Sequence, residues 1–184
     1  MEEHAVVLDY LPEGRSSNFR REPVAQVIGD IHFTLLEVVP KPKISMAIGE
    51  KIYIGKGDRE KIDHIKGRIG YNDLMGAAKT ELVPSIIKIV SDREAEYVNF
   101  FNKCGPVTIR LHQLELFPGI GKKHMKDILD QRETKPFENF KDISERVKLL
   151  PDPKKVIADR VVEELTGASK YYILTRPPQQ PRPY

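Results

Sequence analysis

The sequence predicts an α+β protein in two parts, a small N-terminal β-barrel followed by an all-α domain. Up to residue 71, short apolar segments alternate with turns rich in Gly, Pro and Asp, which is typical of short strands. From residue 72 onward, the apolar residues recur with helical spacing. With 184 residues, of which 40% are hydrophobic and 31% charged, the chain has the composition of one large or two small globular domains.

The composition leads us to expect an intracellular, cytoplasmic protein that does not contact membranes. No apolar run approaches the ~18 residues that a transmembrane helix requires. The acidic start, Met1–His4, is unlike a secretory leader. A single cysteine, Cys104, excludes a disulfide framework and a cysteine-rich zinc site.

The charge is uneven along the chain. Residues 1–104 hold 15 Lys and Arg against 16 Asp and Glu, whereas residues 105–184 hold 15 against 11. The second half is therefore the basic one. A pI of 8.8 permits a polyanionic partner such as nucleic acid without requiring it.

Residues 1–71 are expected to form the barrel. Apolar and polar residues alternate there, as on half-buried strands, and Pro40 and Pro42 end one run because proline donates no ladder hydrogen bond. Four or five short strands with no helix between them favour a closed barrel. The expected strands are Ala5–Leu11, Val24–Ile28, a run that begins at Ile31 and is ended by Pro40, Lys51–Ile54 and Asp63–Tyr71.

Residues 72–105 are expected to be a helical connector. Asn72 is a favourable N-cap, and apolar residues recur with helical spacing from Leu82 to Val90. Gly105-Pro106 ends the connector, and short helices are expected through residues 106–167.

Two further segments follow these helices. Residues 168–176 contain β-branched and aromatic side chains, which favour a strand returning to the barrel. The proline-rich residues 177–184 are expected to be a disordered tail.

The most specific motif is a turn rich in glycine and lysine within Leu114–Lys123. Gly119 and Gly121 let the backbone turn sharply and approach another molecule, and Ile120 between them is placed to fill the space between two helices. The first amides of the following helix are unpaired donors, which is a ready site for a phosphate. Positive charge is added there by Lys122, Lys123 and, one helical turn later, Lys126.

This string resembles the helix-hairpin-helix motif, whose turn holds the nucleic-acid backbone. A weaker second copy is expected 33 residues later, where Pro151 aligns with Pro118. The carboxylate of Asp152 would repel a phosphate, and Pro153 lacks an amide. We therefore expect the second copy to be mainly structural, with two lysines at its rim. It reads Leu149-Leu150-Pro151-Asp152-Pro153-Lys154-Lys155.

The predicted barrel offers a second candidate surface. If the isoleucines of two strands face the interior, the residues between them form an outward basic face with one aromatic ring. Small barrels bind single-stranded nucleic acid with such faces, because cations contact phosphates and a ring stacks on a base. A solvated strand face is the other interpretation. The residues of this face are Lys51, Tyr53, His64, Lys66 and Arg68.

A barrel followed by a glycine-lysine hairpin resembles an uncharacterised archaeal family of predicted nucleic-acid-binding proteins. The resemblance implies an OB-like (oligonucleotide-binding) barrel over residues 1–71, with an SH3-like barrel left open. It also implies a tandem helix-hairpin-helix domain over residues 106–167 whose second hairpin is degenerate. The implied partners are nucleic acid, RNA slightly more than DNA, and proteins linked to the ribosome or to transcription.

Catalytic interpretations find little support. Residues 130–135 lack the catalytic string of base-excision glycosylases, and residues 57–63 lack the acidic partners that a metal-dependent nuclease requires. No P-loop is present, and the five histidines show no metal-ligand spacing. We expect a non-catalytic protein without cofactor or metal. The alternative is a protein-interaction adaptor that docks through the hairpin domain and the barrel.

Overall fold

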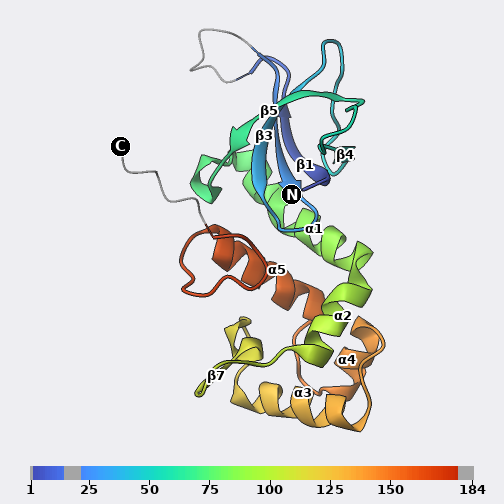
Figure 1. Ribbon diagram of the computed structural model, residues 1–184, viewed down its shortest axis with the longest axis vertical. Helices are drawn as coiled ribbons and strands as arrows, with labels where there is room; N and C mark the ends of the chain where they lie inside the picture. Colours follow the sequence, from blue (N-terminus) through green and yellow to red (C-terminus); the bar gives the residue numbers. More distant parts are fainter. Residues whose placement is uncertain (1, 15–21, 178–184) are drawn as a thin grey trace. The chain divides into compact units, whose positions relative to one another are not determined.

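The chain forms two compact units in the computed structural model, which describes residues 2–14 and 22–177 (Figure 1). The sheet unit comprises Met1–Ser85 and Glu164–Tyr184, and the helical unit comprises Ile86–Glu163. Helices α1 (Gly76–Asp92) and α5 (Pro153–Leu165) each continue from one unit into the other. Residues 72–105, predicted as a helical connector, contain α1, which contributes residues to both units.

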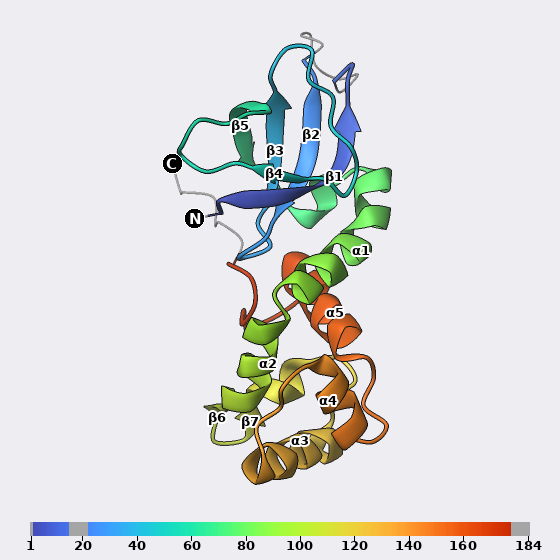
Figure 2. The ribbon, with the colours of Figure 1, turned by 90° about the vertical axis from the view of Figure 1, so that its right-hand side faces the viewer.

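Five antiparallel strands form the sheet, in the order β4-β1-β2-β3-β5. The sheet curls into a half-barrel (Figure 2), and the expected α+β class is confirmed. The expected closed barrel is wrong. No ladder joins β4 to β5 among the described residues, because the three-residue β4 pairs with β1 alone. The strands are β1 His4–Leu11, β2 Val24–Gly29, β3 Leu35–Pro40, β4 Lys51–Tyr53 and β5 Ile62–Arg68.

Alternation along the strands places one apolar face inside the half-barrel, where Val7, Val27 and Ile52 belong to one buried cluster. The other face of β2 carries Gln26, which is also buried. Its side-chain amide donates to the carbonyl of Asp73 at 3.0 Å, and its oxygen accepts from the amide of Met75 at 2.8 Å. These bonds fix the 3-10 helix η1 (Tyr71–Asp73) and the chain entering α1 against the sheet.

The connection between β2 and β3 differs from the prediction. Alternation over Ile31–Leu35 predicts a strand, but residues 30–34 lie in a turn and β3 begins at Leu35. The buried carboxylate of Glu2 occupies the turn's amides, so they are not available for a strand ladder. Hydrogen bonds of 2.9, 3.0 and 3.1 Å reach it from the amides of Ile31, His32 and Thr34.

The C-terminal part of the sheet unit also differs from the prediction. Residues 168–176 contain no strand, so the predicted returning strand is wrong. Backbone amides that a strand would use for a ladder donate instead to the buried carboxylate of Glu164. They belong to Ile173, Leu174 and Thr175, at 3.0, 3.1 and 2.8 Å. The predicted disordered tail, residues 177–184, lies outside the described residues from residue 178 onward.

The helical unit consists of short elements around one apolar core. Residues 106–112, predicted as part of a helical segment, form a two-stranded ribbon instead. The buried core includes Phe101, Leu114, Phe117, Ile128 and Ile143. In chain order after α1, the elements are α2 Glu94–Lys103, β6 Pro106–Thr108, β7 Leu111–His112, the 3-10 helix η2 Gln113–Leu116, α3 Lys122–Thr134, α4 Phe140–Arg146 and α5.

Candidate nucleic-acid interface

The glycine-lysine motif forms a tight turn between η2 and α3. The amide of Ile120 donates to the carbonyl of Phe117 at 3.0 Å, and Gly119 has a φ of 83°. With Pro118 before that glycine, the turn has the residue pattern of type II. A Cβ at Gly119 would lie 3.3 Å from Cγ of Pro151. Position 119 therefore requires glycine for its backbone angle and has little room for a side chain.

Ile120 packs inside the helical unit. Its side chain and that of Phe117 are buried, and the ring of Phe117 lies 5.7 Å from that of Phe100 and 5.9 Å from that of Phe101. The structure thus places Ile120 where its predicted packing role requires it, and leaves Gly119 and Gly121 exposed.

The first turn of α3 is open to an anion. Gly121 is the N-cap, with an extended backbone and no side-chain cap. A Cβ there would meet no atom within 4 Å. Lys122 and Lys123 are exposed, and neither forms an ion pair within residues 2–14 and 22–177. The free amides, the helix dipole and these cations together favour a phosphate.

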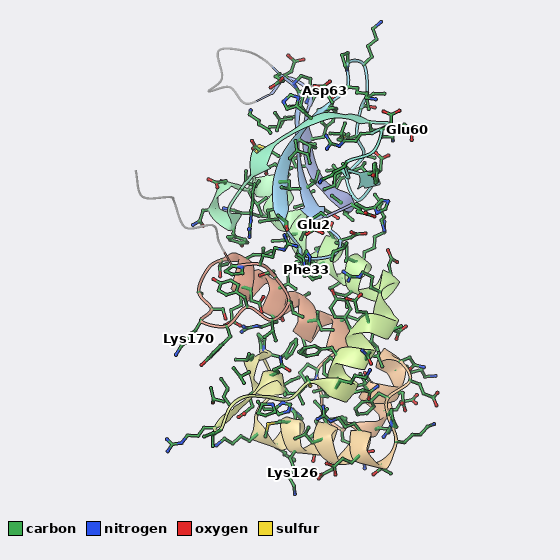
Figure 3. All side chains as sticks on the ribbon, viewed as in Figure 1. Glu2, Phe33, Glu60, Asp63, Lys126 and Lys170 are labelled. Atoms are coloured by element: carbon green, nitrogen blue, oxygen red, sulfur yellow. The ribbon has the colours of Figure 1, made fainter. Side chains whose placement is uncertain are left out.

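Lys126 lies one helical turn further along α3, where its ammonium group is 4.0 Å from the carboxylate of Asp130. Figure 3 shows its side chain extending outward from the helix. The structure therefore brings the predicted glycines and lysines together at the beginning of α3. We call η2, the turn and α3 the first hairpin.

The first arm of this hairpin is η2, a four-residue 3-10 helix. The Nδ1 atom of His112 accepts from the amide of Leu114 at 3.1 Å, and the carboxylate of Glu115 accepts from the amide of His112 at 2.9 Å. Burial, together with the charge of Arg132, lowers the pKa of His112 from its ordinary 6.5. The neutral ring suits this position, because a protonated Nδ1 cannot accept a hydrogen bond.

Arg160, which is not among the residues predicted from the sequence, positions this arm. Its side chain lies on α5, is 2% exposed, and donates from Nη1 to the carbonyl of Leu116 at 3.0 Å. It also lies 3.4 Å from the carboxylate of Glu163. Because Leu116 ends η2 directly before the turn, Arg160 fixes the point from which the turn starts. The sequence feature that could have identified it is an arginine placed among the apolar residues Val156, Ile157, Val161 and Val162.

The turn before α5 is displaced from its predicted alignment. The amide of Leu150 donates to the carbonyl of Val147 at 3.4 Å, and Leu149 has a φ of 63°. Leu149 therefore takes the place of Gly119, 30 residues later instead of the predicted 33. The prediction aligned two prolines, whereas the backbone aligns two turns. We call α4, this turn and α5 the second hairpin.

The start of α5, unlike the start of α3, is not available to an anion. The carboxylate of Asp152 accepts a hydrogen bond from the amide of Lys154 at 3.0 Å, so it occupies the place that an anion would take. Pro153 contributes no amide. Lys155, predicted at the rim, forms an ion pair with Asp159.

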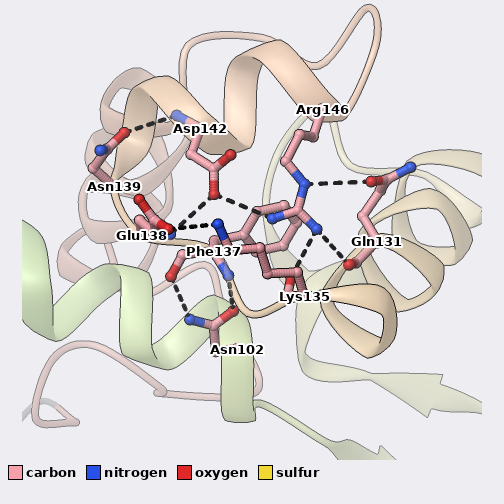
Figure 4. Close-up of polar contacts among 8 residues, drawn as sticks. All are labelled: Asn102, Gln131, Lys135, Phe137, Glu138, Asn139, Asp142 and Arg146. Atoms are coloured by element: carbon pink, nitrogen blue, oxygen red, sulfur yellow. Dashed lines mark hydrogen bonds and ion pairs between the residues drawn. The ribbon is translucent and has the colours of Figure 1, made fainter.

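The linker between the two hairpins is fixed by the polar contacts shown in Figure 4. The guanidinium group of Arg146 donates to two backbone carbonyls, lies 3.1 Å from the carboxylate of Asp142, and lies 4.5 Å from the ring centre of Phe137. The side chain of Asn102 bonds the amide and the carbonyl of Phe137 at 2.8 and 2.9 Å. These contacts connect α2, α3 and α4 through the linker.

The predicted face on the sheet unit is divided between two edge strands, because β4 and β5 lie at opposite edges of the sheet. On β4, the ammonium group of Lys51 lies 2.9 Å from the carboxylate of Asp30. The hydroxyl of Tyr53 accepts from the amide of Gly57 at 3.1 Å. Both side chains therefore have partners within the sheet unit.

The other three residues of this face lie on β5. The Nδ1 atom of His64 is 2.7 Å from the carboxylate of Asp63, and Arg68 donates to the carbonyl of Arg176 at 2.9 Å. Lys66 is exposed. The structure does not place the five predicted residues on one strand pair.

Within residues 2–14 and 22–177, no group of three or more His, Cys, Asp or Glu is placed to hold a metal ion. No helix in this part is long and apolar enough to cross a membrane. A cavity of about 280 Å³ in the sheet unit is lined by Arg68, Tyr71, Glu164 and Arg176 among others. Two of these, Arg68 and Glu164, already bond the backbone.

A curled half-barrel sheet joined to a small helical unit defines an α+β protein of two units. The chain belongs to the family described as "Protein of unknown function (DUF655)", whose model matches residues 1–176. It is 44% identical over 177 residues to "Uncharacterized protein MJ0038" of Methanocaldococcus jannaschii, a match that covers 95% of this chain and 80% of that protein. It is also similar to the crystal structure of Af1531 from Archaeoglobus fulgidus, with a TM-score of 0.90, 44% identity, and coverage of 95% of this chain and 100% of that one.

Proposed function

We propose that this protein is a non-catalytic nucleic-acid-binding protein that holds the phosphate backbone at the first hairpin. The difference between two helix starts in one unit carries the proposal. At α3, a glycine N-cap leaves the first amides open beside Lys122 and Lys123. At α5, the carboxylate of Asp152 already accepts from the helix. A helix start with open amides and adjacent cations is a favourable place for a phosphate.

Under this proposal the helical unit is a tandem helix-hairpin-helix domain with one active hairpin, and the sheet unit is an OB-like half-barrel. Phosphates carry no sequence information, so binding is largely independent of sequence and weakens steeply with salt. The archaeal family resemblance slightly favours RNA over DNA. The same resemblance supports a cytoplasmic protein with partners linked to the ribosome or to transcription.

The exposed apolar side chains favour this function over a protein-interaction adaptor. An adaptor would present a continuous apolar patch. Large exposed hydrophobic residues of the described chain come from four separate turns, and they are Ile31, Ile48, Ile109 and Leu149. Adaptor binding would also change little with salt.

The test is binding of the purified protein to a structured RNA, a duplex DNA and a single-stranded DNA, each titrated across salt by fluorescence anisotropy. Gly121→Asp places a carboxylate at the open helix start, where there is room for it. We expect it to weaken binding at least about tenfold, because a charged hydrogen-bonding site is lost. Lys122→Ala should weaken every ligand alike and lower the salt slope by roughly one.

The matched control is Gly76→Asp. It adds the same charge at the start of α1, where a Cβ also meets no atom within 4 Å, and it should bind as the parent does. Absence of binding to all three ligands at low salt would contradict the proposal. So would parental affinity of a folded Gly121→Asp variant.

A further inference from the structure

Leu149 is unfavourable for the fold in two independent ways. It is 87% exposed, so the side chain gains almost nothing from burial. Its φ of 63° lies in the left-handed region, where a branched side chain is strained and glycine or asparagine is not. Strain of this kind in a surface turn points to a function of the residue itself.

The other exposed or strained residues do not combine these properties. Phe33 has a φ of 53° but is buried. Ile109, in the turn between β6 and β7, is fully exposed, but its φ is not positive. Leu149 is the large hydrophobic residue of the described chain that has both a positive φ and an exposed side chain.

The location of Leu149 relates it to the phosphate site. Pro151, two residues after it, lies against the turn of the first hairpin, because a Cβ on Gly119 would be 3.3 Å from its Cγ. The two turns are therefore neighbours within the helical unit. Lys148, next to Leu149, is exposed as well. An apolar side chain and a cation thus stand beside the amides and lysines of α3.

We propose that Leu149 is a wedge that inserts between stacked base pairs while the first hairpin holds the adjacent backbone. This rests on the proposed function and specifies its ligand as base-paired nucleic acid, RNA or DNA. Proteins insert apolar side chains, leucine among them, between base steps and partly unstack them. A short hydrogen-bonded turn suits this role, because it presents one side chain outward on a fixed backbone. Inserted between bases, Leu149 exchanges contact with water for contact with apolar base faces.

The experiment compares the full-length parent with Leu149→Asn, since asparagine tolerates the left-handed region. The ligands are an RNA duplex, a DNA duplex of the same sequence and one of its single strands, each with 2-aminopurine at an internal position. We expect Leu149→Asn to bind both duplexes roughly tenfold more weakly, since burial of a leucine side chain is lost. We expect 2-aminopurine fluorescence in the duplexes to rise with the parent and not with the variant. The unfolding midpoint of the variant should equal or exceed that of the parent.

The matched control is Ile109→Asn, which removes a fully exposed apolar side chain from another turn and should bind as the parent does. If Leu149→Asn keeps the parental duplex affinity and fluorescence change while Gly121→Asp loses binding, the wedge is wrong and the proposed function stands. If Leu149→Asn weakens single-strand binding as much as duplex binding, insertion between base pairs is also wrong. If the parent binds none of the ligands, both proposals are wrong.

Discussion

Gly119 and Gly121 are two residues apart in one turn, yet the fold requires only the first. Gly119 has a φ of 83° and lies against Pro151. Gly121 has an ordinary extended backbone, with φ of −88° and ψ of −177°, and open space around it. A residue that the fold does not need, at the open start of a helix, is where a binding role can be tested without disturbing the fold.

The first prediction at the residue scale compares two alanine substitutions. Gly119→Ala should lower the free energy of unfolding by about 1–2 kcal/mol, because alanine is strained at positive φ and its Cβ lies close to Pro151. Gly121→Ala should change it by less than about 0.5 kcal/mol. Urea unfolding of both variants measures the difference. Equal losses would show that the turn does not require glycine at position 119.

At the scale of elements, the first arm of the hairpin depends on contacts from outside itself. A 3-10 helix of four residues has little stability of its own. The side chain of His112 caps its beginning, and Arg160 on α5 bonds the carbonyl of Leu116 at its end. The turn that carries the proposed phosphate site is therefore held in place at both ends of η2.

The cap on η2 predicts a pH dependence. The folded-state pKa of His112 is lowered from 6.5 by burial and by Arg132, and the nearby Glu115 opposes this. The unfolded chain therefore takes up the proton first. The stability that the neutral His112 contributes is fully present above pH 6.5 and is lost as the pH falls through its folded-state pKa.

His112→Asn is the control for that dependence, since an asparagine oxygen accepts a hydrogen bond from the amide of Leu114 and does not titrate. Thermal unfolding between neutral pH and about pH 5 should show the parent losing stability relative to this variant. Parallel curves for the two proteins would contradict the role of a neutral His112.

At the scale of the whole molecule, the two ends of the chain contribute to the same unit. The sheet unit contains the N-terminal strands and the chain from Glu164 onward. The C-terminal loop is held there by one buried carboxylate that accepts three backbone amides. Glu2 does the same for the turn between β2 and β3. In both places a buried acidic side chain accepts the backbone hydrogen bonds that a neighbouring strand would accept in a sheet.

The whole-molecule prediction concerns Glu164→Ala. It should lower the free energy of unfolding by more than about 2 kcal/mol, because three backbone amides, that of Thr175 buried, lose a charged acceptor. Trypsin should then cleave faster after Lys170, which is exposed in the loop that Glu164 holds. The control is Glu145→Ala, which removes an exposed pair with Lys141 and should cost less than about 1 kcal/mol. Equal cleavage rates in the parent and Glu164→Ala would contradict the anchoring role.

Much of the candidate site could be predicted from the sequence, because its determinants are local. A proline and a glycine at adjacent positions specify a type II turn, and a glycine before lysines marks the start of α3. Four of the five predicted strands appear near their expected residues, because alternation of apolar and polar residues indicates a strand with one buried face. The beginning of the strand predicted from Ile31 and the returning strand were wrong, because Glu2 and Glu164 bind the amides concerned. No pattern in the neighbouring sequence identifies either carboxylate as the acceptor of these amides.

The sequence by itself therefore determined the class of the fold, the place of the first turn and the cations beside it. Only the tertiary structure decided that the sheet stays a half-barrel, that Arg160 holds η2, and that Leu149 occupies the second turn. The physical reason is separation along the chain. Arg160 bonds a carbonyl 44 residues away, and Glu2 bonds an amide 29 residues away. Such pairings depend on how distant segments pack, and no periodicity or short motif encodes them.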